Sequence, residues 1–213
     1  MNSSATWNKS DPKWLLLPVA AAGLFFGSLA YTDFTQATPA PLASAYAEVV
    51  LPTGHGSATH IGDGLYVTAA HVVGDNAVVQ INGVASAVLW SNSTYDIALV
   101  AGPEQAASVP LWCGTAQVGD TGIAHGNPMD LEGISMSLTV AGSARTIGHW
   151  KVALPMDGSM GPGMSGGGWV VGGALAGVNV GAAMAPTTAG LPSYYGLSIV
   201  VPSSVVCDLM GRV

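Results

Sequence analysis

Hydrophobic and polar positions in this chain alternate over short distances, and no long segment has the 3.6-residue period of an amphipathic helix. From residue 47 onward, runs rich in Val, Ala, Leu and Ile are separated by turn dipeptides such as Asp63-Gly64 and Asn82-Gly83. Short apolar runs bounded by such turns are typical of β-strands. We therefore expect an all-β fold over most of the chain.

The runs fall into two sets of six, separated by a polar, proline-containing bridge at 101–114. The first set lies in 47–100 and consists of EVVL, GSATHIG, LYVTAA, AVVQI, ASAVLW and DIALV. The second set lies in 115–201 and consists of TGIAHG, ISMSLTVAG, KVALP, GGWVV, ALAGVNV and YGLSIVV. Because closing a set of strands removes its exposed edges, the sequence predicts two six-stranded β-barrels.

Two helical segments are expected outside the barrels. In 202–213, Ser203 and Ser204 precede the run VVCDLM, which predicts a short C-terminal helix. Near the N-terminus, an apolar run in 14–32 is uninterrupted by charge from Trp14 to Tyr31 and is long enough to cross a bilayer.

The charges around this apolar run predict its orientation. Lys9 and Lys13 precede it and none follows in 33–46, so the positive-inside rule places 1–13 in the cytoplasm. The segment 33–46 is rich in Thr, Ala, Ser and Pro and is expected to link the membrane anchor to a periplasmic or extracellular domain at 47–213. The alternative is a cleaved signal peptide, because Ala-x-Ala sites follow the run, and the domain would then be secreted.

Composition narrows the possible functions. Charged residues make up 8% of the 213 residues, against ~25% in an average protein. The net charge is -7 with 5 Lys and Arg in total, so no basic patch can neutralise phosphates and nucleic acid is not an expected partner. The 2 cysteines and 5 histidines stand at no metal-ligand spacing, so neither a metal nor another cofactor is expected. The cysteines could form one disulfide or stay as buried thiols.

Three short motifs carry the groups that acyl transfer at a peptide bond requires, namely a hydroxyl nucleophile, a base and an acid that orients the base. In GPGMSGG, glycines on both sides of Ser165 permit a sharp turn and close approach to a substrate carbonyl. The strand LYVTAA ends at His71, and Asp96 directly precedes the apolar strand IALV. An acid placed there would be partly buried and could accept the Nδ1–H of the histidine. Each motif alone is common in turns and strand ends, so the combination carries the argument.

Together the motifs resemble the signatures of trypsin-like serine peptidases, which have the chymotrypsin fold: G-x-S-G-G, T-A-A-H and D-I-A-L. The chain order His, Asp, Ser is also that of this family and differs from the orders in subtilisins and α/β-hydrolases. The resemblance implies that Ser165 is the nucleophile, His71 the general base and Asp96 the orienting acid. It also implies that the N–H groups of Gly163 and Ser165 form the oxyanion hole.

Within this family, GHGSA before the histidine strand and GVNV after the serine are most similar to the HtrA (Deg)-like branch. By this likeness Asn179 supports Asp96, and the primary substrate pocket is lined by Asn179, Val180 and Gly181. Ser159 would lie at the pocket base, so we expect a preference for small or apolar side chains. HtrA-like members carry a PDZ domain after the protease domain, whereas this sequence ends at Val213, so we expect a protease core without a PDZ domain.

The resemblance also implies roles for three further residues. Digestive members place an acid directly before the nucleophile to bind a new N-terminus, and Met164 excludes that mode of activation here. Cys113 in the bridge and Cys207 on the terminal helix lie on elements that some trypsin-like enzymes tie together. We expect a disulfide between them outside the cytoplasm.

The expected function is that of a serine endopeptidase acting on protein or peptide substrates. The principal alternative is a catalytically silent trypsin-like fold that serves as a structural or binding component of a membrane or particle assembly, which the low content of charge would suit. An esterase that uses the same triad is not separated from a peptidase by the sequence, because both transfer an acyl group to water.

Overall fold

Strands make up nearly all the regular structure in the computed structural model, which describes residues 44–186 and 192–211. The expected segments at 1–13 and 14–32, and most of the linker at 33–46, lie outside these residues. Within the described residues, no helix combines the length and the hydropathy that crossing a bilayer requires.

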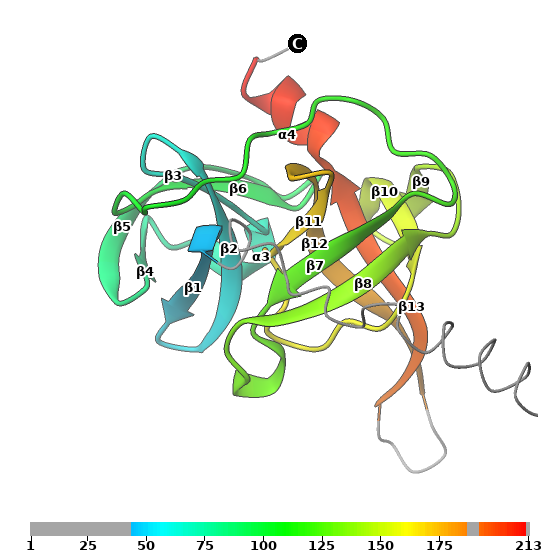
Figure 1. The fold of residues 1–213 in the computed structure, drawn as a ribbon. Coiled ribbons are helices and arrows are strands. Elements are labelled where there is room, and N and C mark those ends of the chain that lie inside the picture. The colour runs from blue at the N-terminus through cyan, green and yellow to red at the C-terminus, as the bar shows by residue number, and fades with distance from the viewer. Residues whose placement is uncertain (1–43, 187–191, 212–213) are drawn as a thin grey trace, which may run out of the picture. The chain divides into compact units, whose positions relative to one another are not determined.

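The first half of the described chain is a closed barrel of six strands in the order β1-β2-β3-β6-β5-β4 (Figure 1). Its strands are β1 (Tyr46–Leu51), β2 (Gly54–Gly62), β3 (Leu65–Thr68), β4 (Val78–Ile81), β5 (Val84–Asn92) and β6 (Ile97–Ala101). The short helix α3 (Ala70–Val73) directly follows β3. Buried apolar side chains such as Val49, Tyr66 and Ile81 fill the barrel, so the first predicted barrel is confirmed.

The second half is a seven-stranded sheet in the order β13-β12-β11-β7-β8-β10-β9, in which β13 also pairs with β10. Its strands are β7 (Thr121–Gly126), β8 (Ile134–Val140), β9 (Arg145–Ile147), β10 (Trp150–Asp157), β11 (Gly168–Val171), β12 (Ala174–Pro186) and β13 (Pro192–Pro202). The prediction of a second six-stranded barrel is therefore wrong: the six expected strands are present, but they belong to a seven-stranded sheet, in which the additional strand β9 pairs with β10 across a turn at Gly148. Strand β9 has no buried residue and therefore no alternating pattern in the sequence.

The C-terminal helix is confirmed as α4 (Ser203–Leu209). Its buried residues Val205 and Val206 belong to an apolar cluster that also contains Val67 of the barrel and Val178 of the second sheet. Burying a side chain of this kind contributes about 1.5–3 kcal/mol, so this cluster fixes the two halves against each other.

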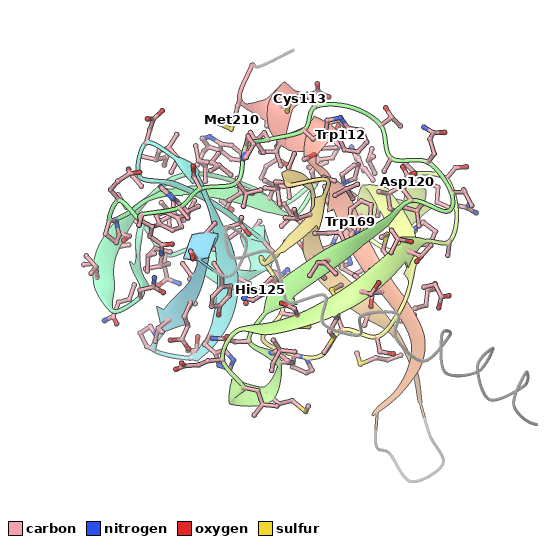
Figure 2. All side chains as sticks on the ribbon, in the orientation of Figure 1. Trp112, Cys113, Asp120, His125, Trp169 and Met210 are labelled. Atoms are coloured by element: carbon pink, nitrogen blue, oxygen red, sulfur yellow. A yellow bond between two sulfur atoms is a disulfide. The ribbon has the colours of Figure 1, made fainter. Side chains whose placement is uncertain are left out.

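The bridge between the two halves passes beside α4, as Figure 1 shows. Here Cys113 and Cys207 form a disulfide with a Cα–Cα distance of 5.7 Å, which confirms the expected pairing (Figure 2). The hydroxyl of Ser203 donates a hydrogen bond to the carbonyl of Trp112, so the bridge is attached to the helix by a second contact.

Candidate active site

His71 and Asp96 meet where two neighbouring strands of the barrel have their ends. His71 lies on α3 directly after β3, and Asp96 directly precedes β6, which pairs with β3. The Asp96 Oδ2 atom lies 2.7 Å from Nδ1 of His71, and Oδ1 accepts the backbone N–H of His71 at 2.8 Å. These two contacts fix the imidazole relative to the carboxylate. With Nδ1 donating to the acid, Nε2 is the ring nitrogen that can accept a proton.

The carboxylate of Asp96 is shielded from solvent but well supplied with donors. Asp96 is 3% exposed and has a left-handed backbone with φ 59°, a conformation that Asp tolerates better than most residues. The indole Nε1–H of Trp150 donates to Oδ2 at 2.9 Å. Burial disfavours the charged form, but the hydrogen bonds from His71 and Trp150 outweigh this effect and lower the pKa of Asp96. The acid is therefore ionised at neutral pH.

Ser165 lies in the nucleophile loop, which we define as residues 161–167, between β10 and β11. The backbone N–H of Ser57 on β2 donates to the carbonyl of Ser165 at 2.8 Å, which ties the loop to the barrel. Gly166 has φ 85°, and a Cβ at this position would lie 2.1 Å from the carbonyl oxygen of Ser57. The close approach of the loop to β2 therefore requires glycine directly after the serine.

Gly163 also requires the absence of a side chain. It has φ 94°, and a Cβ here would lie 2.0 Å from the carbonyl oxygen of Asn127. Its own carbonyl accepts a hydrogen bond of 2.7 Å from the Ser57 hydroxyl, which in turn accepts the N–H of Asn127 at 3.2 Å. The hydroxyl of Ser57 thus bridges two segments of the second half and holds the loop in one conformation.

Some backbone N–H groups of the nucleophile loop have partners within the protein. Those of Met164, Gly166 and Gly167 donate to carbonyl oxygens at 2.7 to 3.2 Å. No protein acceptor is found in the described part of the chain for the N–H groups of Gly163 and Ser165. These are the two groups expected to form the oxyanion hole.

The side chain of Met164 anchors the nucleophile loop by packing into the protein interior. It is fully buried in an apolar cluster that includes Leu138, Met156 and Trp169. An apolar residue therefore occupies the position at which digestive trypsin-like enzymes hold an ion pair, and packing of Met164 in this cluster holds the loop here.

His71 and Ser165 line the same groove, which has a volume of about 300 Å³ and is also bordered by His55 and Gly163. The side chain of His71 is 46% exposed, whereas that of Asp96 is 4% exposed. A molecule in the groove could therefore reach the serine and the imidazole, with the acid covered behind them. The sequence did not single out His55, because an isolated histidine between two glycines carries no spacing signal.

A second cavity of about 140 Å³ adjoins Ser165 and is lined mainly by apolar residues, including Met160, Met164, Gly181 and Met184. Of the four residues expected at the substrate pocket, Gly181 lines this cavity. The walls would suit an apolar side chain better than a charged one.

The other three expected pocket residues lie elsewhere. Ser159 is exposed, and Val180 is buried in the cluster between the two halves. Asn179 is fully buried, and its side-chain amide donates to the carbonyl of His125 at 3.3 Å. The hydrogen bonds to Asp96 come from His71 and Trp150, so the support expected from Asn179 is supplied by a tryptophan.

Two rings pack edge to face across the two halves, those of the half-buried Tyr46 on β1 and the buried His125 on β7, with centroids 4.9 Å apart. Nδ1 of His125 lies 2.6 Å from the hydroxyl of Ser135. Burial lowers the pKa of His125 and raises that of Tyr46, so both groups are neutral near pH 7. Figure 2 labels His125 where the second sheet approaches the barrel.

Comparison of the sequence with models of known protein families finds no match, and neither does comparison with curated proteins. Solved structures share the fold. The HtrA-type protease AlgW with a tripeptide superposes with a TM-score of 0.68 and 21% identity, covering 80% of this chain and 60% of AlgW. The inactive form of the protease Rv3671c superposes with a TM-score of 0.66 and 16% identity, covering 98% of each chain. Another inactive structure of Rv3671c, from M. tuberculosis, gives a TM-score of 0.65.

These similarities establish the architecture: the chain has a trypsin-like, HtrA-type protease fold. It spans 60% of the length of the AlgW chain, whose structures contain bound peptides. At sequence identities of 16% to 21%, these similarities establish the fold and not the catalytic activity. Any argument about activity depends on the residues described above.

Proposed function

We propose that this protein is a serine endopeptidase in which Ser165, His71 and Asp96 form a catalytic triad. The observation that carries the proposal is the 2.7 Å contact between Nδ1 of His71 and the buried carboxylate of Asp96, at the edge of a groove that Ser165 also lines. A surface histidine with no catalytic task has no need of a shielded acid that binds both its ring and its backbone.

The proposed reaction begins when a peptide enters the groove with its carbonyl carbon next to Ser165. The serine oxygen attacks this carbon while Nε2 of His71 removes the hydroxyl proton, and Asp96 stabilises the imidazolium that forms. The N–H groups of Gly163 and Ser165 stabilise the negative charge on the carbonyl oxygen. His71 then returns the proton to the leaving amine, and a water molecule repeats the sequence to release the acyl group.

The substrate class follows from the cavity next to Ser165. Its walls of Met160, Met164 and Met184 offer no charge to a basic or acidic side chain. The enzyme therefore prefers substrates with an apolar residue before the cleaved bond. The AlgW structures, which contain a bound decapeptide or tripeptide, support a peptide substrate.

The experiment that tests the endopeptidase activity is digestion of a peptide library of known sequence by the wild type and by Ser165→Ala. We expect cleavage after apolar residues by the wild type and none by the variant. Hydrolysis of small esters without cleavage of any peptide would instead identify an esterase. Strict cleavage after Lys or Arg would contradict the assignment of the apolar cavity.

The proposed location is outside the cytoplasm, either anchored by 14–32 or secreted after cleavage. The Cys113–Cys207 disulfide supports it, because structural disulfides are rare in reducing compartments. The charge asymmetry around the apolar run supports it independently. Mass spectrometry of the mature N-terminus from the native host separates the two forms, and recovery of the protein from the cytoplasm with free thiols would contradict both.

A further inference from the structure

Trp150, the first residue of β10, contacts both halves of the site although no triad motif contains it. Its indole Nε1–H donates to Oδ2 of Asp96, at the end of the barrel, with a length of 2.9 Å. Its six-membered ring lies against Gly181 on β12, where a Cβ would come within 2.8 Å of Cη2 of the indole. One side chain therefore joins the acid of the triad to the strand beside the nucleophile.

The acid needs this second donor because it is hidden from water. The Asp96 side chain is 4% exposed, so an unpaired lone pair on Oδ2 would keep much of its desolvation cost. Nδ1 of His71 and Nε1 of Trp150 both bind this oxygen. Apart from the ring and the backbone N–H of His71, the indole is the donor to Asp96 found within the described residues.

The contact with Gly181 depends on a local irregularity in β12. The register between β12 and β13 shifts between Asn179 and Gly181, a bulge that turns the following backbone. Gly181 then lines the cavity next to Ser165 with one side and meets the indole with the other. Any larger residue at this position would push Trp150 away from its contact.

We propose that Trp150 is the positioning residue of this site, orienting Asp96 through its indole N–H and supporting the substrate-lining strand through Gly181. Substrate bound along this strand and the orientation of the base are then coupled through one rigid side chain. This inference rests on the proposed peptidase function.

Removing the indole N–H changes the charge that His71 faces. The neighbouring titratable groups are Asp75 and His149, which with His71 and Asp96 line a groove of about 440 Å³. The ring of His149 packs against that of Trp150 at a tilt of 36°, with centroids 4.0 Å apart. Without the indole donor, more negative charge remains on the Oδ2 atom of Asp96, which favours the protonated form of the imidazole.

The test compares wild type, Trp150→Phe and the control Trp90→Phe, a half-buried tryptophan on β5. Phenylalanine keeps an aromatic ring near Gly181 and deletes the donor. We expect kcat/KM of Trp150→Phe to fall roughly 10-fold, mainly through kcat, as for loss of a hydrogen bond to a charged group. We also expect the pH at which kcat/KM of this variant falls to half its maximum on the acid side to be higher than in the wild type. Trp90→Phe should match the wild type in both respects.

A readout without turnover separates this inference from the function on which it rests. The proton between Nδ1 of His71 and Asp96 can be observed by ¹H NMR, and we expect its resonance to shift or broaden in Trp150→Phe and not in Trp90→Phe. If the wild type is inactive towards a fluorophosphonate, the peptidase function fails and the resonance alone decides the positioning role. If the wild type reacts and Trp150→Phe keeps its rate, pH midpoint and resonance, the inference is overturned. Should Trp150→Phe not fold, Gly181→Ala displaces the indole from the other side and is subject to the same readouts.

Discussion

The hydroxyl of Ser57 on β2 donates a hydrogen bond of 2.7 Å to the carbonyl of Gly163 in the nucleophile loop. This bond joins a barrel strand to the segment that precedes Ser165. Ser57 and Gly163 are 106 residues apart in the chain. The same hydroxyl accepts the backbone N–H of Asn127. The conformation of the nucleophile loop therefore depends on the barrel as well as on the loop itself.

Ser57→Ala removes this link and leaves the carbonyl of Gly163 and the N–H of Asn127 without their partner. We expect kcat to fall about 10-fold with little change in KM, and the free energy of unfolding to fall by about 1–3 kcal/mol. Steady-state kinetics and urea unfolding measure the two effects. Ser91→Ala, at an exposed position on β5, is the control, and equal activity of both variants would contradict the role of Ser57.

Gly163→Ala tests whether the loop can accept a side chain. A Cβ here would lie 2.0 Å from the carbonyl oxygen of Asn127, so the loop must move and the N–H of residue 163 must turn. We expect kcat/KM to fall by at least about 100-fold, the range seen when one oxyanion donor is lost. Gly172→Ala is the matched control, because Gly172 also has positive φ (57°) but a Cβ there meets nothing within 4 Å. Similar activity of the two variants would exclude an oxyanion role for Gly163.

The buried imidazole of His125 makes stability depend on pH. Its folded-state pKa is lowered by burial, so below the ordinary value of ~6.5 the unfolded chain takes up a proton before the folded protein does. The stabilisation that comes from keeping His125 neutral is therefore fully present above pH ~6.5, and it is lost as the pH falls below this value. The lowered pKa of Asp96 acts in the same direction but below pH ~4, outside this window.

Urea unfolding at pH 5, 6 and 7 measures this dependence. We expect His125→Gln to be less stable than the wild type at pH 7 but to lose less stability on acidification. His149→Gln, which alters an exposed histidine, should keep the wild-type slope. An unchanged slope in His125→Gln would show that another group is responsible.

The Cys113–Cys207 disulfide closes a long loop, with a sequence separation of 94 residues. In the loop-entropy model its removal lowers the free energy of unfolding by about 4–5 kcal/mol. Replacing both cysteines with serine should lower the stability by this order, and reduction of the wild type should have the same effect. Because the disulfide lies between the bridge and α4, kcat/KM should be unchanged at temperatures where the variant is folded. A variant as stable as the oxidised wild type would contradict a stabilising role.

Much of the fold could be predicted from alternation and turns. All twelve expected strand segments are strands, and all of them except ASAVLW contain buried apolar residues. Strand β9 could not be found in this way, because its three residues are stabilised by pairing with β10 and not by burial. The number of strands in the second half therefore depended on a tertiary contact that the local pattern does not encode.

The residues of the candidate site also fall into those that the sequence predicts and those that it does not. His71, Asp96 and Ser165 lie in motifs that their spacing and order make recognisable, and the structure brings the first two into contact. Trp150 and Ser57 act on this site through contacts between segments distant in the chain, for which no sequence spacing exists. The expectation for Asn179 failed for the same reason: its amide is bound by His125, which lies 54 residues earlier.

The most direct test of the proposed triad is reaction of the intact protein with a fluorophosphonate, followed by mass spectrometry of the protein and its peptides. The account predicts one adduct per chain on Ser165 of the wild type. It also predicts no adduct on Ser165→Ala and a rate reduced by several orders of magnitude for His71→Ala. A folded wild-type protein that forms no adduct, or an adduct on a different residue, would contradict the assignment of Ser165 as the nucleophile.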